Sequence, residues 1–190
     1  MKVFKWIVGI LAALLLFGYF FGLPYLREQT KKASPERTAT FTENGYDLKA
    51  TYCSPSKKGR EMFGDLVPYG QVWRTGANEA TTFHSATALE VEGQALPAGD
   101  YSLWTIPGPR QWTVIFNREI PEWGVTLSSL GRKTTRNPQA DVLQVQVPVL
   151  PPGPQPEIHE NFLIDFTTRG QGLFLRFAWD TTQVLVRLNS

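Results

Sequence analysis

The chain has 190 residues, which is enough for one domain of ordinary size and an additional terminal segment. Hydrophobic residues make up 42% of it, a fraction too high for an intrinsically disordered chain. Residues 1–37 contain six basic and two acidic residues, net +4, whereas residues 38–190 contain thirteen basic and fifteen acidic residues, net −2. The larger part therefore has no basic excess, which argues against nucleic acid as its partner.

The N-terminal residues 1–26 predict a membrane anchor. Residues 6–26 carry no charge, and a helix of this length at about 1.5 Å per residue matches a hydrocarbon core of about 30 Å. Pro24 lies near the end of this run, where a helix break costs little. A cleaved signal peptide is the main alternative, but the residues that follow the run, 22–26, make a poor cleavage site. We therefore expect a retained single span.

Residues 27–37 are polar and predict a juxtamembrane linker. Basic residues flank the span on both sides, so the positive-inside rule does not decide the orientation. A very short N-terminal tail before a long folded domain is typical of a signal anchor, which keeps its N-terminus in the cytoplasm. We expect a single-pass membrane protein whose domain lies outside the cytoplasm, in the periplasm.

Residues 38–190 predict an all-β, β-sandwich-like domain. Short alternating segments separated by glycine- and proline-containing turns recur along this region, and no long helical period does. We expect a turn over residues 94–99 and a final hairpin turn over residues 180–182. The strands are expected at residues 47–52, 80–86, 89–92, 100–106, 111–117, 142–149, 162–166, 173–179 and 184–188.

The long connection over residues 54–82 is where a binding site is expected, because long loops in compact domains are often functional. Its arginines present planar forks suited to carboxylate or phosphate, and its aromatic rings offer stacking faces. Such a set suits an anionic or carbohydrate-like ligand. The candidate ligand-binding residues are Arg60, Tyr69, Trp73, Arg74, Asn78 and Glu79. The alternative is structural: a buried Arg74–Glu79 pair above Trp73 that pins the loop to the sandwich.

The sequence resembles the domain-of-unknown-function (DUF) 2911 family over residues 46–188. The motifs that carry the resemblance are 58–60 (KGR), 63–64 (FG), 68–70 (PYG), 72–82 (VWRTGANEATT), 96–103 (LPAGDYSL), 112–117 (WTVIFN) and 123–124 (WG). The resemblance implies a compact β-rich domain of bacterial envelope proteins with no established activity and no agreed catalytic residues. The chain departs from the family pattern at Cys53, where the family more often shows serine followed by arginine.

Other chemistry-bearing residues give weaker signals. Cys53 has no histidine near it in sequence, so we interpret it as a strand residue rather than a catalytic thiol. A possible metal site is formed by the sequence of Glu157, His159 and Glu160. On a strand Glu157 and His159 share a face, but no third ligand stands at a convincing spacing, so no metal and no cofactor is expected. His84 follows the long loop and is interpreted as a half-exposed strand residue.

Three hypotheses follow for function. The first is a non-enzymatic membrane-anchored envelope domain that binds a small-molecule or protein ligand through residues 54–82; the absence of a nucleophile–base pair favours it over catalysis without excluding an enzyme. The second is an envelope hydrolase acting on carbohydrate or peptide, for which Glu79 and Asp65 are the nearest acidic pair. The third is a purely structural scaffold.

Overall fold

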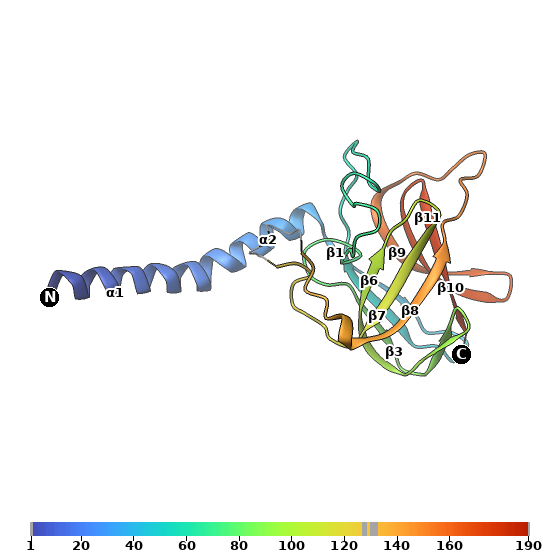
Figure 1. The fold of residues 1–190 in the computed structure, drawn as a ribbon, viewed down its shortest axis with the longest axis horizontal. Helices are drawn as coiled ribbons and strands as arrows, with labels where there is room; N and C mark the ends of the chain where they lie inside the picture. The colour runs from blue at the N-terminus through green and yellow to red at the C-terminus, as the bar shows by residue number, and fades with distance from the viewer. Residues whose placement is uncertain (1, 127–128, 130–132, 190) are drawn as a thin grey trace. The chain divides into compact units, whose positions relative to one another are not determined.

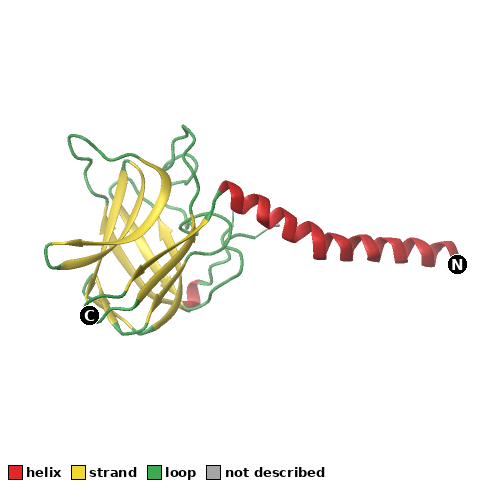
Figure 2. Cartoon of the chain, turned by 180° about the vertical axis from the view of Figure 1, so that it is seen from behind, coloured by secondary structure: helices red, strands yellow, loops and turns green. Residues whose placement is uncertain are grey.

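The structure of the chain, a computed structural model, describes residues 2–126, 129 and 133–189. It divides between Ala33 and Ser34 into two compact units. The first is helical and the second is built of strands, as Figures 1 and 2 show. The predicted fold class, one apolar N-terminal helix and an all-β domain, is therefore confirmed.

The helical unit runs from α1 (Lys2–Phe17) through a π-helical turn, η1 (Gly18–Gly22), into α2 (Leu23–Ala33). The stretch Trp6–Ala33 is long and apolar enough to cross a membrane. The helix does not end at Pro24. Proline lacks the amide hydrogen that the carbonyl one turn earlier would accept, and the wider π-turn directly before it is a usual way to accommodate that loss.

The strands described within residues 34–126 and 133–189 form two antiparallel sheets. The six-stranded sheet has the order β1-β2-β3-β6-β7-β8 and the five-stranded sheet has the order β5-β4-β11-β10-β9. The strands of the first sheet are β1 (Glu36–Phe41), β2 (Leu48–Cys53), β3 (Thr82–Ser85), β6 (Gly99–Ile106), β7 (Gln111–Asn117) and β8 (Asp141–Pro148). Those of the second are β4 (Leu89–Val91), β5 (Gln94–Leu96), β9 (His159–Arg169), β10 (Gly172–Asp180) and β11 (Thr182–Asn189).

The predicted turn over residues 94–99 is wrong in its first half, because residues 94–96 form strand β5 paired with β4. The turn lies earlier, at Glu92 and Gly93, whose φ angles are 49° and 79°. Two consecutive residues with positive φ are the signature of a tight hairpin turn that matches the twist of the strands. The expected turn between β10 and β11 is confirmed at residues 180–182.

The main core lies between the two sheets and is rich in aromatic rings. Alternate residues of each strand point into it, as period-two patterning requires. Its largest fully buried side chains include Trp112, Trp179, Phe83, Phe116, Phe162 and Phe177. The sandwich is closed at its sides, where β1 lies against β9 and β8 lies against β5 and β11.

A second, smaller core lies on the opposite face of the six-stranded sheet. Ala80, Trp104 and Ile115 are buried there, with Val72 and Ile106 packed against them. Strands β6 and β7 are thus covered on both faces: by the other sheet on one side and by residues of the long 54–82 connection on the other. Val72 and Ala80 are the residues of this connection that pack on the outer face of β6 and β7.

Candidate functional site

The first part of the 54–82 connection is fastened to the start of β9. The amide of Lys57 donates to the carbonyl of Glu160 at 2.7 Å, and the amide of Phe162 donates to the carbonyl of Pro55 at 2.9 Å. The hydroxyl of Ser56 donates to the Asn161 side chain at 2.6 Å. These bonds between segments about a hundred residues apart satisfy backbone groups that a free loop would leave to water.

The last part of the connection takes the place of a strand. Strand β3 pairs only with residues 99–102 of β6, which leaves the edge of the second half of β6 open. Trp73 closes it by exchanging backbone hydrogen bonds with Thr105 at 2.7 and 3.0 Å, and the Gly70 amide donates to the Pro107 carbonyl at 2.8 Å. Residues 70–73 are therefore held by the sheet.

Trp73 belongs to the aromatic core. Its ring centroid lies 4.9 Å from that of Phe162 and 6.0 Å from that of Trp179, to which it is nearly parallel. Its indole N–H donates to the carbonyl of Gly76 at 3.1 Å. The half-buried ring thus joins the connection to the space between the sheets.

The turn after Trp73 depends on glycine. Gly76 has a φ of 149°, and a β-carbon there would lie 2.9 Å from the Cys53 carbonyl oxygen and 3.2 Å from the Thr81 hydroxyl. Thr75 and Asn78 also have positive φ, 57° each. The Thr81 hydroxyl donates to the Thr75 carbonyl at 2.7 Å and holds the strained turn closed.

Arg74 lies against residue 124 of a different loop. A β-carbon at Gly124 would come within 2.6 Å of Arg74 Cδ and 2.7 Å of Arg74 Cβ. Arg74 Nε is buried and has no hydrogen-bond partner among the described residues. This burial lowers the pKa of the Arg74 guanidinium from its ordinary value. The aliphatic part of Arg74 is thus a packing element.

Glu79 accepts a hydrogen bond from a buried thiol. Cys53 Sγ lies 3.2 Å from Glu79 Oε2, and only 2% of Cys53 is exposed. Burial, followed by the hydrogen bond and the negative charge of Glu79, raises the pKa of the Cys53 thiol to about 11. A thiol that stays protonated is a poor nucleophile. Cys53 is therefore a packed strand residue, as expected.

Asn78 and Arg60 also serve local structure. Asn78 is buried, its amide group lies 3.5 Å from the Ser34 carbonyl, and its own carbonyl accepts from the Gly124 amide at 3.3 Å. Arg60 is exposed and curls back on the loop, donating from Nε to the Lys57 carbonyl at 3.0 Å and from Nη2 to the Ser56 carbonyl at 2.8 Å.

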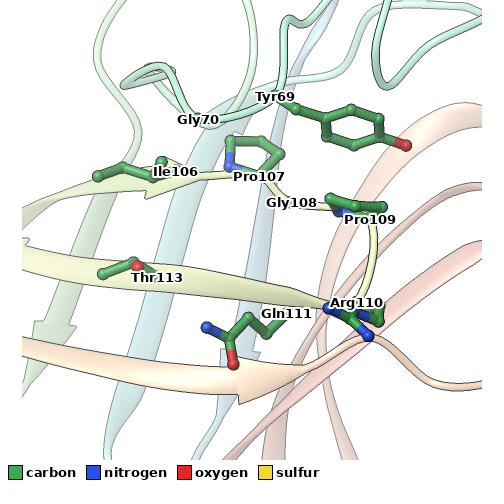
Figure 3. A pocket seen from close by; sticks show the side chains of 9 residues that line it. All are labelled: Tyr69, Gly70, Ile106, Pro107, Gly108, Pro109, Arg110, Gln111 and Thr113. Carbon is green, nitrogen blue, oxygen red and sulfur yellow. The ribbon is translucent and has the colours of Figure 1, made fainter.

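Tyr69 is the candidate residue that lines an open cleft. It is 44% exposed, and its ring rests on Gly64, where a β-carbon would lie 2.9 Å from Tyr69 Cε2. The cleft has a volume of about 520 Å³ on the outer face of β6 and β7. Figure 3 shows Tyr69 on one side, Gln111 and Thr113 on the other, and the prolines of the β6–β7 turn between them. It is lined by Tyr69, Gly70, Ile106, Pro107, Gly108, Pro109, Arg110, Gln111 and Thr113.

The six candidate residues thus lie in four environments. Trp73 lies in the core, Arg60 lies against the backbone of residues 56–57, and Tyr69 lies at the cleft. The remaining three, Arg74, Asn78 and Glu79, lie around the 74–79 turn. Their role in ligand binding stays a prediction. Sequence reasoning missed Arg110, Gln111 and Thr113. A signal is present, because Gln111 and Thr113 alternate with the inward residues of β7, but the proline-glycine-proline turn beside them indicates only a connection when the sequence is considered alone.

The remaining chemistry-bearing residues are paired locally. His159 Nε2 lies 3.5 Å from Glu157 Oε2 and 3.4 Å from Gln183 Nε2. His84 Nδ1 lies 2.8 Å from Asp100 Oδ1 on the outer face of the six-stranded sheet. Among residues 2–126, 129 and 133–189, no group of three or more His, Cys, Asp or Glu side chains is placed to hold a metal ion.

Comparison with known protein families gives a match over most of the chain. The model of a family described as "Protein of unknown function (DUF2911)" matches residues 34–188. The matched region begins at the first residue of the strand-built unit and ends two residues before the last residue of the sequence. No curated protein and no solved structure matches the chain.

Proposed function

Since the chain belongs to the DUF2911 family of proteins of unknown function, we propose its role from the geometry of its own site: a membrane-anchored binding module that holds its ligand in the cleft beside Tyr69. The 54–82 connection remains the binding segment, and its ligand contact lies at Tyr69 and Gly70. The rest of the connection, on this view, fixes these two residues against the sheet.

The observation that carries the proposal is a pre-positioned, exposed aromatic ring above polar side chains that are open to solvent. The Tyr69 ring lies on Gly64, and the amide of the neighbouring Gly70 donates to the Pro107 carbonyl, so the backbone that carries the ring is fastened to the β6–β7 hairpin. A cleft of about 520 Å³ falls within the roughly 300–1,000 Å³ that is usual for ligand sites. A rigid site loses little entropy on binding.

Binding fits this cleft better than hydrolysis does. Hydrolysis of a glycoside needs two carboxyl groups on either side of the bond, and none of the residues that line the cleft carries one. Glu79, the acidic residue considered for that role, accepts a hydrogen bond from Cys53. The scaffold hypothesis leaves the exposed ring and the open cleft without a role.

The helix Trp6–Ala33 supports attachment to a membrane. We place the N-terminus in the cytoplasm and the strand-built unit in the periplasm of a bacterial cell, as a retained signal anchor would. Two full-length fusions test this placement, one carrying alkaline phosphatase and one a green fluorescent protein at the C-terminus, because the phosphatase is active only after export. Active phosphatase in the membrane fraction supports the placement. A fluorescent fusion whose phosphatase counterpart is inactive contradicts it.

Hydrogen exchange tests the binding role even while the ligand is unidentified. The full chain in lipid nanodiscs is exposed to a soluble extract of the cell envelope, and exchange is followed by mass spectrometry. We expect protection in peptides that cover residues 66–71 and 106–113. Tyr69→Ala should remove that protection, whereas Leu66→Ala, which alters an exposed residue of the same turn outside the cleft, should retain it. Protection elsewhere, or none, contradicts the proposal.

A further inference from the structure

We infer that the ligand of the Tyr69 cleft is an acidic oligosaccharide. The inference rests on the proposed function, because it names the chemical class that the same cleft would take. Three properties of the cleft support it: where it lies on the sheet, which surfaces it offers, and which charges line it.

The position of the cleft excludes recognition by strand addition. It lies over β6 and β7, whose backbone groups are already paired with each other from Ser102–Asn117 to Ile106–Thr113, and whose outer neighbours are residues 70–73 and β8. A peptide cannot add a strand to β6 or β7, because neither strand has an open backbone edge over the cleft. The ligand must be read by side chains on the face of the sheet.

The aromatic surface is a single fixed platform. Much of Tyr69 is exposed, and Gly64 supports the ring so closely that a β-carbon at residue 64 would collide with it. A sugar ring presents one face of C–H groups that stacks on such a surface, and its hydroxyls remain free to bond at the edges. The Tyr69 hydroxyl makes no hydrogen bond to the described residues, so it is available to a sugar hydroxyl.

The polar surface is made of uncharged groups that both donate and accept. Gln111 and Thr113 point outward from β7, and Gln146 of β8 stands directly beside Thr113 in the register. The Gln111 amide lies 3.5 Å from Gln146 Oε1, so the two side chains lie together along the strand pair. Amide and hydroxyl groups match hydroxyl groups, which also donate and accept, better than they match an apolar ligand.

The charge of the cleft selects an acidic sugar. Arg110 is exposed, lines the cleft, and forms no ion pair with the described residues. None of the residues that line the cleft carries a carboxylate. A guanidinium fork without an internal partner is complementary to the carboxylate of a uronic acid, which it can hold through two parallel hydrogen bonds.

A proline-rich peptide is the competing occupant, since aromatic residues also recognise extended proline helices. Such grooves are lined by several aromatic rings that receive successive prolines. The residues that line this cleft include one aromatic ring, Tyr69, and a cation that no described residue pairs. The sugar is therefore the better match, and the peptide becomes an outcome of the test.

The test measures binding to the full chain in nanodiscs by calorimetry, with hydrogen exchange to locate each bound probe. The probes are tetragalacturonate, the neutral sugar cellotetraose and a soluble proline-rich peptide. We expect tetragalacturonate to bind at residues 66–71 and 106–113 more tightly than cellotetraose, by about two- to fivefold, the effect of one partly exposed ion pair. Added salt should reduce this preference.

Two variants separate the contributions. Tyr69→Ala should weaken both sugars by about tenfold, as the loss of a central aromatic anchor does. Arg110→Gln should remove the preference for the acidic sugar while retaining the neutral one. Arg169→Gln, which removes an exposed arginine outside the cleft, is the matched control and should change neither.

The outcomes distinguish the two proposals. Binding of tetragalacturonate at the cleft, with these variant effects, supports the inference. Protection of the cleft by the peptide alone, or by cellotetraose with no preference for the acid, overturns the acidic-sugar assignment and leaves the binding role standing. Protection of the cleft by the envelope extract but by none of the three probes likewise overturns only the assignment. If neither the probes nor the extract protects the cleft, both proposals fail.

Discussion

The ring of Tyr69 rests on the backbone of Gly64, so closely that a β-carbon at residue 64 would lie 2.9 Å from Tyr69 Cε2. Gly64 also has a φ of 99°, in the region that favours glycine. Two constraints therefore favour glycine at position 64: the positive φ of its backbone and the close contact with the Tyr69 ring.

Gly64→Ala should destabilise the fold by about 1–3 kcal/mol, from backbone strain and from displacement of Tyr69. Gly59→Ala is the matched control, because Gly59 also has a positive φ, 71°, but has no atom within 4 Å of its added β-carbon. Urea unfolding of the full chain in nanodiscs measures both. Equal losses in the two variants would show that the Tyr69 contact contributes nothing.

Gly124→Ala should also destabilise the fold, because the new methyl group would collide with the aliphatic part of Arg74 at 2.6–2.7 Å. Overpacking of this kind costs about 1–3 kcal/mol. The control is Gly153→Ala, at an exposed position where a β-carbon meets no atom within 4 Å. The difference between their thermal unfolding midpoints measures the contact, and an unchanged midpoint in Gly124→Ala would argue against it.

Alkaline pH should lower the free energy of unfolding, because burial opposes the ionisation of Cys53. Its folded-state pKa is raised to about 11 from an ordinary value of 9.0, first by burial and then by Glu79. A raised folded pKa means that the associated stability is complete below pH 9 and is lost as pH rises towards 11. The measurement is the urea midpoint at a series of pH values for the unaltered chain and for Cys53→Ala.

The unaltered chain should lose more stability than Cys53→Ala between pH 9 and 11, since tyrosines and lysines titrate in both proteins and cancel in the comparison. Alkylation of the folded chain by iodoacetamide should likewise stay slow until the pH approaches 11. Parallel stability curves for the two proteins would contradict the raised pKa.

Trp73→Ala should cost about 3–5 kcal/mol, the usual loss for deleting a large aromatic side chain from a core. The ring packs against Phe162 and Trp179, so its removal leaves a cavity. Trp73→Phe keeps an aromatic ring but loses the indole hydrogen bond to Gly76, and it should cost less. Urea unfolding measures both variants. If both unfold at the midpoint of the unaltered chain, the ring belongs to the surface and not to the core.

The sequence predicted most of the sandwich because its strands carry period-two patterning. Leu173, Leu175 and Phe177 alternate with outward residues, and they pack into the core. Strands β1 and β5 were not among the predicted strands. Most residues of β1 are exposed, so no buried alternation marks it. Strand β5 has three residues, too few to show a period, and its tight turn uses Glu92 and Gly93, a less familiar turn pair than asparagine–glycine.

The site was harder to predict than the fold. The sequence located the long connection but could not divide it, since residues 70–73 act as a strand only because β3 is too short to cover β6. Arg110 and Gln111 were missed for the same reason, because they come close to Tyr69 only after the β6–β7 hairpin has formed. Contacts between segments so far apart in sequence depend on the tertiary fold.

Residues 70–73 replace a missing strand through their backbone, whereas ligand contact falls to the side chains beside them. The hydrogen bonds of Trp73 and Gly70 to β6 use backbone groups, so they place few demands on the side chains next to them. Tyr69 directly precedes this segment, and Arg110 lines the same cleft from the β6–β7 connection. Neither side chain makes a hydrogen bond to the described residues. Exchanging them should alter what is recognised without unfolding the domain, which makes the chain a scaffold whose specificity can evolve independently of its stability.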